Sequence, residues 1–422
     1  MADRERDPER GRDPERDDRR EREREQELER AGWNVLNLDP RAIDIDLLTD
    51  IPLDPVALVA ERAAAAAAAG RADPAPAELA GLAETLFGAP RTLFFTKGRA
   101  AELALSAALI PAGSVVLTNG LFRTTQRSVE VRGAAVELSP LAARGSSAID
   151  LAWARTRMAE ARVAAIYVEL ASNARAGWTL DLDHLRALRS LCDERGALLL
   201  IDGTRGLANA RAQGPGLPAL ATARAALELA DAFALSCAKE FLVPSGALVG
   251  MRDLAAQRAA FLYGFEEGSL LEAAHPRALL AEGLREVAAH PDWIDRRAAQ
   301  LALLAGELRR LGVPFLEPVG AHAVFVPVDP DAGPGPHGSR ALEALLYWRT
   351  GIRTLVHNSP LTGGRLVRLV LGVGRHGDDG VRRAAAGIAR WRASAAGETP
   401  SLSPVPSDSL HEYFGRFARA GA

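Results

Sequence analysis

Short apolar runs alternate with amphipathic runs between about residues 90 and 236 of the 422-residue chain. Six of the apolar runs have the composition of buried strands: TLFFT, SVVLT, AAVEL, VAAIYVEL, ALLLID and DAFALS. Between them lie segments with helical spacing of apolar residues, such as RAAELALSAAL and LDHLRALRSLCDE. This alternation of strand and helix predicts an α/β fold with a mainly parallel central sheet, covered by helices on both faces.

The pattern changes after about residue 273. A long helical stretch over residues 273–311 leads into short strands (AVFVPV, IRTLV, RLVRLVLG) and helices around residues 341–350 and up to about 392. We therefore expect a large domain over residues 51–300 and a smaller α+β domain made of residues 28–50 and 301–422. Ligands of parallel α/β sheets bind beyond the carboxyl ends of the strands, so residues at strand ends are the first candidates for function.

The N-terminal residues 1–27 are a run of charges in which RDPER occurs twice. Because it has no apolar stripe, this segment cannot bury a face, and we expect it to be disordered or to form a solvated helix. We expect ordered structure to begin near Leu28, where aromatic and branched residues start to appear. The alanine run after Glu61 ends at Gly70 and predicts a helix that a glycine and a turn terminate.

Composition and charge narrow the class of protein. Hydrophobic residues make up 48% and charged residues 25% of the chain, as in globular proteins. The net charge of −3 gives no reason to expect a nucleic-acid or membrane partner. The two cysteines do not indicate a disulfide framework, and the N-terminus is charged where a signal peptide has an apolar core. We expect a cytoplasmic enzyme without a metal site.

Lysine is almost absent from the chain. Of the 51 lysine and arginine residues, only Lys97 and Lys239 are lysines. Arginine serves where a positive charge is sufficient, but its pKa is too high for an amine that must lose its proton and attack a carbonyl. The two lysines are therefore candidates for chemistry, with chance survival on the surface as the alternative for each.

Two strand ends carry residues suited to a pyridoxal phosphate (PLP) cofactor. Asp202 ends the run ALLLID, and a buried carboxylate needs a cationic partner such as a protonated pyridine nitrogen. The alternative is a helix-capping or turn aspartate. Lys239 follows the next run, where it can form an imine with the cofactor and move the Cα proton of a substrate. Ser236, three residues earlier, is suited to bind phosphate.

Two further segments complete this constellation. In FFTKGRAAE a strand runs through a glycine into a helix start, so Gly98 allows close approach of the backbone, and Lys97 or Arg99 adds charge for a phosphate. Asn173 lies just beyond the strand VAAIYVEL, where it can bond the phenolic oxygen of the cofactor. An ordinary turn asparagine is the alternative. The four sites in this order are far more specific than any one of them.

In these and other segments the chain resembles the β-eliminating lyases, the tryptophanase and tyrosine phenol-lyase family, over nearly all of residues 17–417. The segments that carry the resemblance follow the family's order: LERAGWNVLNLDPRAIDIDLLTD, TKGRAAELALS, LIDGTRGLANA, ALSCAKEFLV, AEGLREV, EPVGAHAVF, LVRLVLG and LHEYFGRF. The resemblance implies a PLP-dependent transferase fold of the aspartate-aminotransferase type (fold type I). It also implies a homodimer or a homotetramer.

The resemblance implies a set of residues around the cofactor. In chain order they are Lys97, Gly98, Arg99, Phe122, Asn173, Asp202, Arg205, Ser236 and Lys239. Among them Phe122 would stack on the ring, and Arg205 would lie near the phenolic oxygen together with Asn173. Lys239, Asp202 and Arg205 would be the catalytic residues.

On the substrate side, Arg368 would bind the α-carboxylate through the two prongs of its guanidinium group. A solvated strand arginine is the alternative. Thr49 and His322 also match family positions near the substrate.

The departures from the family lie on the side of the leaving group. Residues 51–53, Ile-Pro-Leu, replace a Ser-Gly-Thr stretch, and RADPAPAELAG replaces the segment whose tyrosine acts as an acid toward the leaving group. Four other residues that differ from the family are Arg123, Ala238, Pro244 and Ser269. The cofactor residues are thus kept, whereas the leaving-group residues are replaced.

The sequence therefore predicts a PLP-dependent lyase that acts on an amino acid other than tryptophan or tyrosine. It would remove the Cα proton in an external aldimine and then eliminate or replace a β-substituent. An aminotransferase, a racemase or an aldolase-type enzyme is the alternative, since the same cofactor residues serve them all. A non-catalytic scaffold with this fold is a third reading, against which the retained Lys239 argues.

Overall fold

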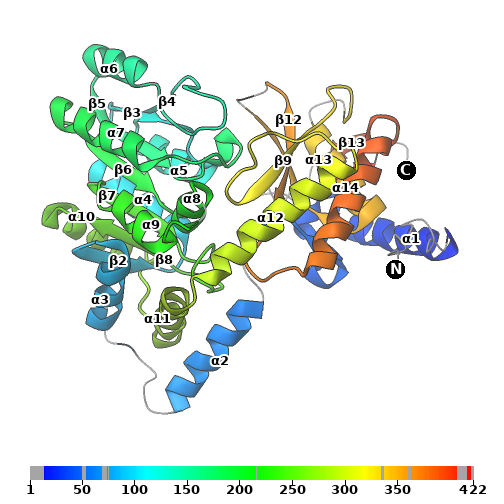
Figure 1. Ribbon diagram of the computed structural model, residues 1–422, viewed down its shortest axis with the longest axis horizontal. Coiled ribbons are helices and arrows are strands. Elements are labelled where there is room, and N and C mark those ends of the chain that lie inside the picture. Colours follow the sequence, from blue (N-terminus) through cyan, green and yellow to red (C-terminus); the bar gives the residue numbers. More distant parts are fainter. Residues whose placement is uncertain are drawn as a thin grey trace.

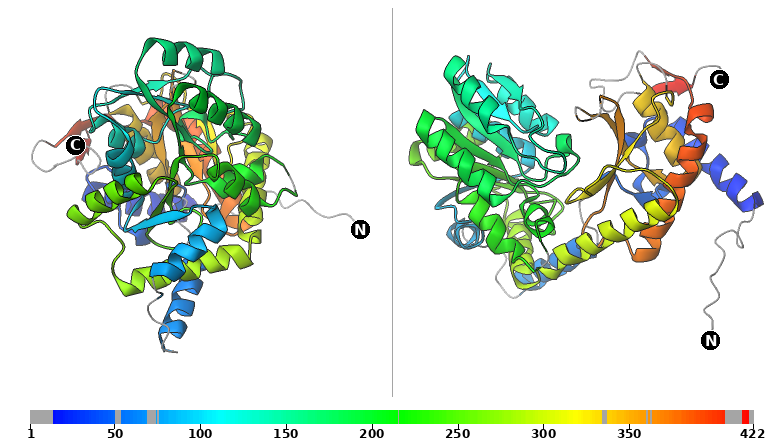
Figure 2. Two further views of the ribbon diagram at one scale, coloured as in Figure 1. Left: turned by 90° about the vertical axis from the view of Figure 1, so that its left-hand side faces the viewer. Right: turned by 45° about the horizontal axis from the view of Figure 1, so that its top comes forward.

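The computed structural model describes residues 14–49, 54–68, 74, 76–214, 216–333, 337–359, 361, 363–405 and 416–419. These residues form an α/β body and a smaller α+β body, and the long helix α12 (Asp292–Arg310) runs from one to the other (Figures 1 and 2). Within these ranges, no helix is long and apolar enough to cross a membrane.

A seven-stranded sheet forms the centre of the α/β body, in the order β2-β8-β7-β6-β5-β3-β4. Its strands are β2 (Arg91–Phe95), β3 (Val115–Thr118), β4 (Ala135–Leu138), β5 (Val163–Glu169), β6 (Leu198–Asp202), β7 (Ala232–Ser236) and β8 (Ala247–Met251). Strands β3 to β7 pair in parallel, whereas β8 is antiparallel to both β2 and β7. The prediction of a mainly parallel sheet is confirmed. Strand β8 lies outside the six predicted runs. The prediction relied on the alternation of strands and helices, and an antiparallel strand can follow its neighbour without a helix between them.

Side chains of the sheet alternate between two hydrophobic cores. On β5, Ile166 and Val168 pack on one face, and Ala165 and Tyr167 pack on the other. The helices on the first face are α3 (Pro76–Phe87), α7 (Leu182–Arg195), α9 (Ala219–Leu227) and α11 (Ala274–Ala289). Those on the second are α4 (Gly98–Leu109), α5 (Arg123–Glu130) and α10 (Leu254–Glu266). The sheet is thus buried on both faces, as the continuous apolar runs predict.

Four further elements belong to this body: α2 (Asp54–Ala68), α6 (Leu151–Glu160), α8 (Gly206–Ala212) and the 3-10 turn η3 (Asn173–Arg175). The predicted alanine-rich helix corresponds to α2, while Gly70 lies outside the described residues.

The long helical stretch predicted over residues 273–311 is present as two helices, α11 and α12. Pro291 stands between them, and His290 before it has φ −131° and ψ 68°. Proline lacks a backbone N–H and disfavours the helical conformation of the preceding residue, so the helix cannot continue through this point.

In the α+β body, three strands pair antiparallel in the order β11-β12-β9. The strands of this body are β9 (Ala323–Pro327), β10 (Ile352–Arg353), β11 (Leu355–Asn358), β12 (Arg365–Val370), β13 (Leu402–Pro404) and β14 (Phe417–Arg419). Its helices are α13 (Gly338–Thr350) and α14 (Asp378–Glu398). Strand β1 (Ile45–Asp46) pairs in parallel with β10, and Leu47 joins the core that contains Leu345 and Trp391. This pairing supports the proposed assignment of residues 28–50 to the small domain.

Two 3-10 turns, η1 (Val35–Asn37) and η2 (Pro40–Ala42), connect β1 to helix α1 (Pro14–Arg30). Helix α1 is exposed along most of its length, and it lies beside α13 at the edge of the small body (Figure 1). Leu28 is its buried anchor, and ion pairs join Glu21 to Arg349 and Glu25 to Arg419. Residues 14–27 thus fit the second alternative considered for this segment, a solvated helix, and residues 1–13 lie outside the described ranges.

Candidate active site

The candidate residues of the large domain gather at the carboxyl ends of β5, β6 and β7. Asp202 is the last residue of β6, and its Cα pairs across the sheet with that of Glu169, the last residue of β5. Ser236 ends β7, and Lys239 lies in the turn that follows. Because parallel strands end on the same edge of the sheet, residues scattered over seventy positions share one site.

Asp202 is buried and held by two hydrogen bonds. One oxygen, Oδ2, accepts from the Thr125 hydroxyl at 3.2 Å, and the other, Oδ1, accepts from the backbone N–H of Thr204 at 3.1 Å. The second bond closes a turn, so the turn role weighed as an alternative is present beside any role toward a cofactor. Neither bond supplies the positive charge that a buried carboxylate requires.

Two further carboxyl groups lie buried near Asp202. Glu169 lies 3.7 Å from the Arg205 guanidinium, and its Oε1 accepts from the Asn173 amide at 2.8 Å. Burial, and then the charge of Asp202, raise the pKa of Glu169 to about 8 and that of Glu102, on α4, to about 7. Sequence analysis did not select either residue, although Glu169 ends an apolar strand just as Asp202 does.

This cluster fits a protonated pyridine nitrogen. One oxygen each of Glu102 and Glu169, and the hydroxyl of Tyr167, are buried with no hydrogen-bond partner among the described residues. Burial, and then the nearby carboxylates, raise the pKa of Tyr167 well above its usual range, so the phenol carries no charge. A cluster of buried carboxyl groups favours a cationic ligand group at this end of the site.

The opposite end fits a phosphate. Helix α4 begins at Gly98, with Lys97 at the N-cap position. A Cβ atom on Gly98 would lie 2.9 Å from the Cβ atom of Ser236, so only glycine allows the helix start to approach β7 this closely. Backbone amides at a helix start attract anions, and the charges of Lys97 and Arg99 add to this attraction. Phe122, immediately before α5, lies three residues from the Thr125 that bonds Asp202.

The substrate-side candidates meet at Asn173. Its Oδ1 accepts from the Arg368 guanidinium at 2.9 Å and lies 3.2 Å from Nε2 of His322. A second nitrogen of Arg368 donates to the Leu48 carbonyl at 3.1 Å, next to Thr49. The structure therefore brings Asn173, Arg368, His322 and the Thr49 segment together from both domains. Burial, and then the charge of Arg368, lower the pKa of His357, on β11, to about 4, so its imidazole is neutral.

Glu240, the residue after Lys239, is fully buried. Its carboxylate accepts from the backbone N–H groups of Leu207 and Ala208, at 2.8 and 3.0 Å, and pairs with Arg297 of α12. It thereby joins the lysine turn to the start of α8, next to Arg205, and to the helix that runs toward the small domain.

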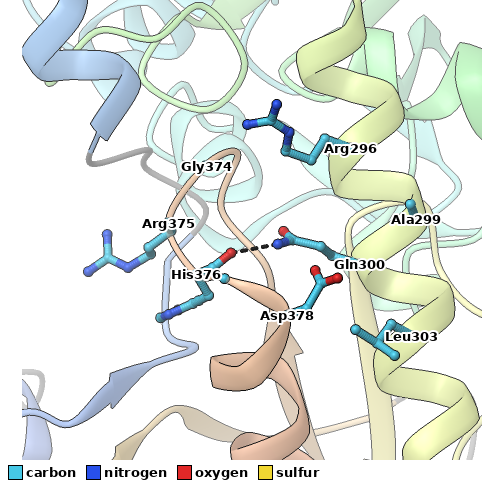
Figure 3. Close-up of a pocket in the computed structure, with 9 residues that line it drawn as sticks. Arg296, Ala299, Gln300, Leu303, Gly374, Arg375, His376 and Asp378 are labelled. Atoms are coloured by element: carbon cyan, nitrogen blue, oxygen red, sulfur yellow. Dashed lines mark hydrogen bonds between the residues drawn. The ribbon is translucent and has the colours of Figure 1, made fainter.

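A cavity of about 580 Å³ lies elsewhere, between α12 and the loop before α14 (Figure 3). Its lining residues are Arg296, Ala299, Gln300, Leu303, Gly374, Arg375, His376, Gly377 and Asp378, none of which is a predicted site residue. The Gln300 amide donates to the His376 carbonyl across it. The candidate active site is assigned by its chemistry at the strand ends, not by this cavity. No cluster of three or more potential metal ligands occurs in the part of the chain that the structure describes.

Comparison with known proteins decides the family. Residues 46–386 match the family model described as Beta-eliminating lyase. The chain belongs to this family. The lyase is similar to a probable tryptophanase of Halobacterium salinarum, with 29% identity over 388 residues that cover 83% of this chain and 84% of the relative. It is also similar to a tyrosine phenol-lyase of Intrasporangium calvum, with 31% identity over 267 residues that cover 57% of this chain and 55% of the relative.

Solved structures agree on the fold. The lyase is similar to the Leishmania major threonine aldolase, with a TM-score of 0.63 and 16% identity over 82% of this chain and 99% of that chain. It is similar as well to a serine palmitoyltransferase from S. paucimobilis with bound PLP-myriocin, with a TM-score of 0.63 and 14% identity over 91% of this chain and 99% of that chain. The predictions of fold type I, of a PLP-dependent lyase and of pyridoxal phosphate as cofactor are confirmed.

Part of the leaving-group region lies outside the described residues. This holds for residues 51–53, 71–73 and 75, which carry two of the departures from the family. Among the described departures, Ser269 donates its backbone N–H and its hydroxyl to the carbonyl of Gly264, the former at 2.9 Å and the latter at 3.2 Å. Its side chain thus serves the turn after α10.

Proposed function

We propose that this lyase removes the Cα proton of an amino acid and then eliminates or replaces a β-substituent, and that its substrate is neither tryptophan nor tyrosine. The observation that carries the proposal is the arrangement at the strand ends: the buried Asp202 at the end of β6 and Lys239 just beyond β7, with Arg368 held at Asn173. Amino-acid chemistry on this cofactor needs three groups: a carboxylate that pairs with the ring nitrogen, an amine and an arginine that binds the substrate carboxylate. Asp202, Lys239 and Arg368 are of these three types.

In this proposal Asp202 holds the ring nitrogen protonated, and Lys97, Gly98, Arg99 and Ser236 bind the phosphate. Phe122 covers one face of the ring. When bound, pyridoxal phosphate supplies an electron sink for the charge that develops at Cα. Hydrogen bonds from Thr125 and the Thr204 amide fix the orientation of the Asp202 carboxylate toward the site.

Lys239 is the group that moves the proton at Cα, because an amine that has lost its proton is a base near neutral pH and arginine is not. Arg205 and Asn173 orient the phenolic oxygen, and the Glu169 carboxyl beside both of them fixes their positions. Arg368 binds the α-carboxylate, with the Leu48 carbonyl and Asn173 holding its guanidinium plane. Thr49 and His322 limit the space around the bound substrate.

Tryptophan and tyrosine are expected to react at least about 10²-fold more slowly than amino acids whose β-substituent leaves without protonation, since a positioned acid contributes about 10²–10⁴-fold. Suitable comparisons are β-chloroalanine, O-acylserines and S-substituted cysteines. Pyruvate, ammonia, indole and phenol are measured at equal enzyme concentration. Indole or phenol release as fast as pyruvate formation from β-chloroalanine would contradict the proposal.

The same assays separate the alternatives. An aminotransferase yields a keto acid without ammonia, a racemase yields the D-enantiomer, and an aldolase yields glycine and an aldehyde. A scaffold shows no change of the cofactor spectrum with any amino acid.

We also propose a homodimer or homotetramer. Helix α10, which packs on α4, exposes Phe261, Leu262 and Phe265, and the two phenylalanine rings stack with centroids 6.1 Å apart. Such an apolar face on a helix next to the cofactor site fits a subunit contact. Sedimentation should show a dimer or larger assembly, and Phe265→Asp should shift it toward the monomer. The control Leu217→Asp, at another exposed apolar side chain outside α10, should not, and an active wild-type monomer would contradict the proposal.

A further inference from the structure

Three carboxyl groups share the buried end of the site with one guanidinium group. Glu102 comes from α4, Glu169 from β5 and Asp202 from β6, and their exposed fractions are 8%, 1% and 3%. Arg205, which pairs with Glu169, is the cation among them. If all three acids were ionised, the cluster would carry a net charge of −2 in a region from which water is excluded, which is costly.

Glu102 is the member of this cluster with the weakest compensation. Thr124 and Thr125 lie near its side chain, but its Oε2 is buried without a hydrogen-bond partner among the described residues. The charged and titratable groups that act on it are Asp202, Arg99 on its own helix and, across the site, Tyr167. Helix α5, which also packs on α4, carries the charged residues Arg123, Arg127 and Glu130. The core beneath α4 receives apolar side chains from the other elements: Phe95 of β2, Ala234 of β7, Ala247 and Val249 of β8, and Ala256 and Ala260 of α10.

Thr125 connects Glu102 to Asp202. Its hydroxyl donates to Asp202 Oδ2, so its oxygen is left to accept a bond. A protonated Glu102 can provide that bond, because a carboxylic acid donates through its O–H. Such a bond would extend the observed bond from the Thr125 hydroxyl to the Asp202 carboxylate into a directed chain that begins at the Glu102 acid. When Glu102 and Glu169 are both protonated, the charges of Asp202 and Arg205 cancel and the cluster has no net charge.

We propose that Glu102 is a proton-exchanging partner of Asp202, which holds its proton in the cofactor-free protein and releases it when the protonated ring nitrogen binds beside Asp202. The proposal rests on the proposed pairing of Asp202 with that nitrogen. The positive charge of the ring nitrogen stabilises a second carboxylate nearby, which lowers the free-energy cost of ionising Glu102 at this buried position. The O–H bond of the Glu102 acid breaks, its proton passes to the solvent buffer, and no other bond changes.

The direction of the pH effect follows from linkage. Burial raises the pKa of Glu102 to about 7 in the cofactor-free protein, and the ring nitrogen lowers it again in the complex. The contribution of Glu102 to cofactor affinity is therefore fully present above pH 7 and is lost as the pH falls through the lower pKa of the complex. Each unit by which binding lowers this pKa changes the cofactor affinity about tenfold across that window.

The test is calorimetric titration of pyridoxal phosphate into cofactor-free protein at pH 7, in two buffers with different ionisation enthalpies. Wild type and Glu102→Gln bind the same cofactor in the same buffers, so the difference between them reports the proton linked to Glu102. Wild type should release up to roughly half a proton more, since a group at its pKa is half protonated. Glu343→Gln, at a buried glutamate of the small domain, is the matched control and should behave as wild type.

Equal proton release by wild type and Glu102→Gln would overturn the inference. If Glu102→Gln does not fold, infrared difference spectra of the wild type give the same answer. The wild type should lose part of its protonated-carboxyl C=O absorption on cofactor binding, while the Glu169 acid keeps its own band. Binding without any loss of this absorption would overturn the inference too. Failure of the proposed lyase reaction looks different, because turnover would then be absent while the proton release remained normal.

Discussion

Replacing Lys239 by alanine is expected to abolish the covalent linkage to the cofactor and to lower turnover by about 10³-fold, a value within the range for a positioned acid–base group. Lys239→Arg should do no better, because a guanidinium keeps the positive charge but does not lose its proton near neutral pH. The measurements are the visible absorption of the bound cofactor and the rate of product formation with the best substrate.

Lys97 provides the matched control. In the proposed site it adds only positive charge near the phosphate, so Lys97→Arg should keep the visible absorption and most of the activity. Borohydride reduction followed by peptide mapping identifies the lysine directly. A pyridoxyl group on Lys97 instead of Lys239 would show that the assignment of the two lysines is reversed.

Asp202→Asn is expected to lower turnover by about 10²-fold or more, the scale of one preorganised electrostatic interaction in an active site. The one oxygen of asparagine can still accept from the Thr204 N–H and so preserve the turn. Its NH2 group takes the place of Oδ2, where it can donate to the Thr125 oxygen, and the charge toward the ring nitrogen is lost. The effect should therefore appear in turnover and not in the thermal stability of the protein.

Asp181→Asn is the control for this substitution. Asp181, which is not among the proposed site residues, caps α7 by accepting from the backbone N–H of His184, and asparagine is an equally good helix cap. Its activity should equal that of wild type. An Asp202→Asn enzyme with a wild-type rate would mean that Asp202 serves only the turn.

The sheet could be predicted from the sequence because its strands are buried on both faces and read as unbroken apolar runs. Residues at the ends of those runs, such as Asp202 and Ser236, could be placed at one edge for the same reason. Glu169 carries the same strand-end signal. Glu102 carries none, because a glutamate inside an amphipathic helix usually faces water, and its burial depends on how α4 meets α5 and β6.

Contacts between the domains were beyond prediction from sequence patterns. Asn173, Arg368 and His322 lie up to 195 positions apart, and their hydrogen bonds depend on how β12 of the small domain faces the end of β5. The resemblance to a family named these residues, but the bond from Arg368 to Asn173 appears only in the folded chain. The break at Pro291 shows the opposite case, a local rule that overrides a long periodic pattern.

The buried pair of Glu240 and Arg297 constrains how this enzyme can change. Losing either partner leaves an uncompensated buried charge, which destabilises a protein by about 3–5 kcal/mol, so the two positions can vary only together. Glu240 belongs to the lysine turn and Arg297 to the helix that leads toward the small domain. Consider a hybrid enzyme that keeps Glu240 and takes the chain after it from a relative. It would need an arginine at the position of Arg297, even if every residue around the substrate matched.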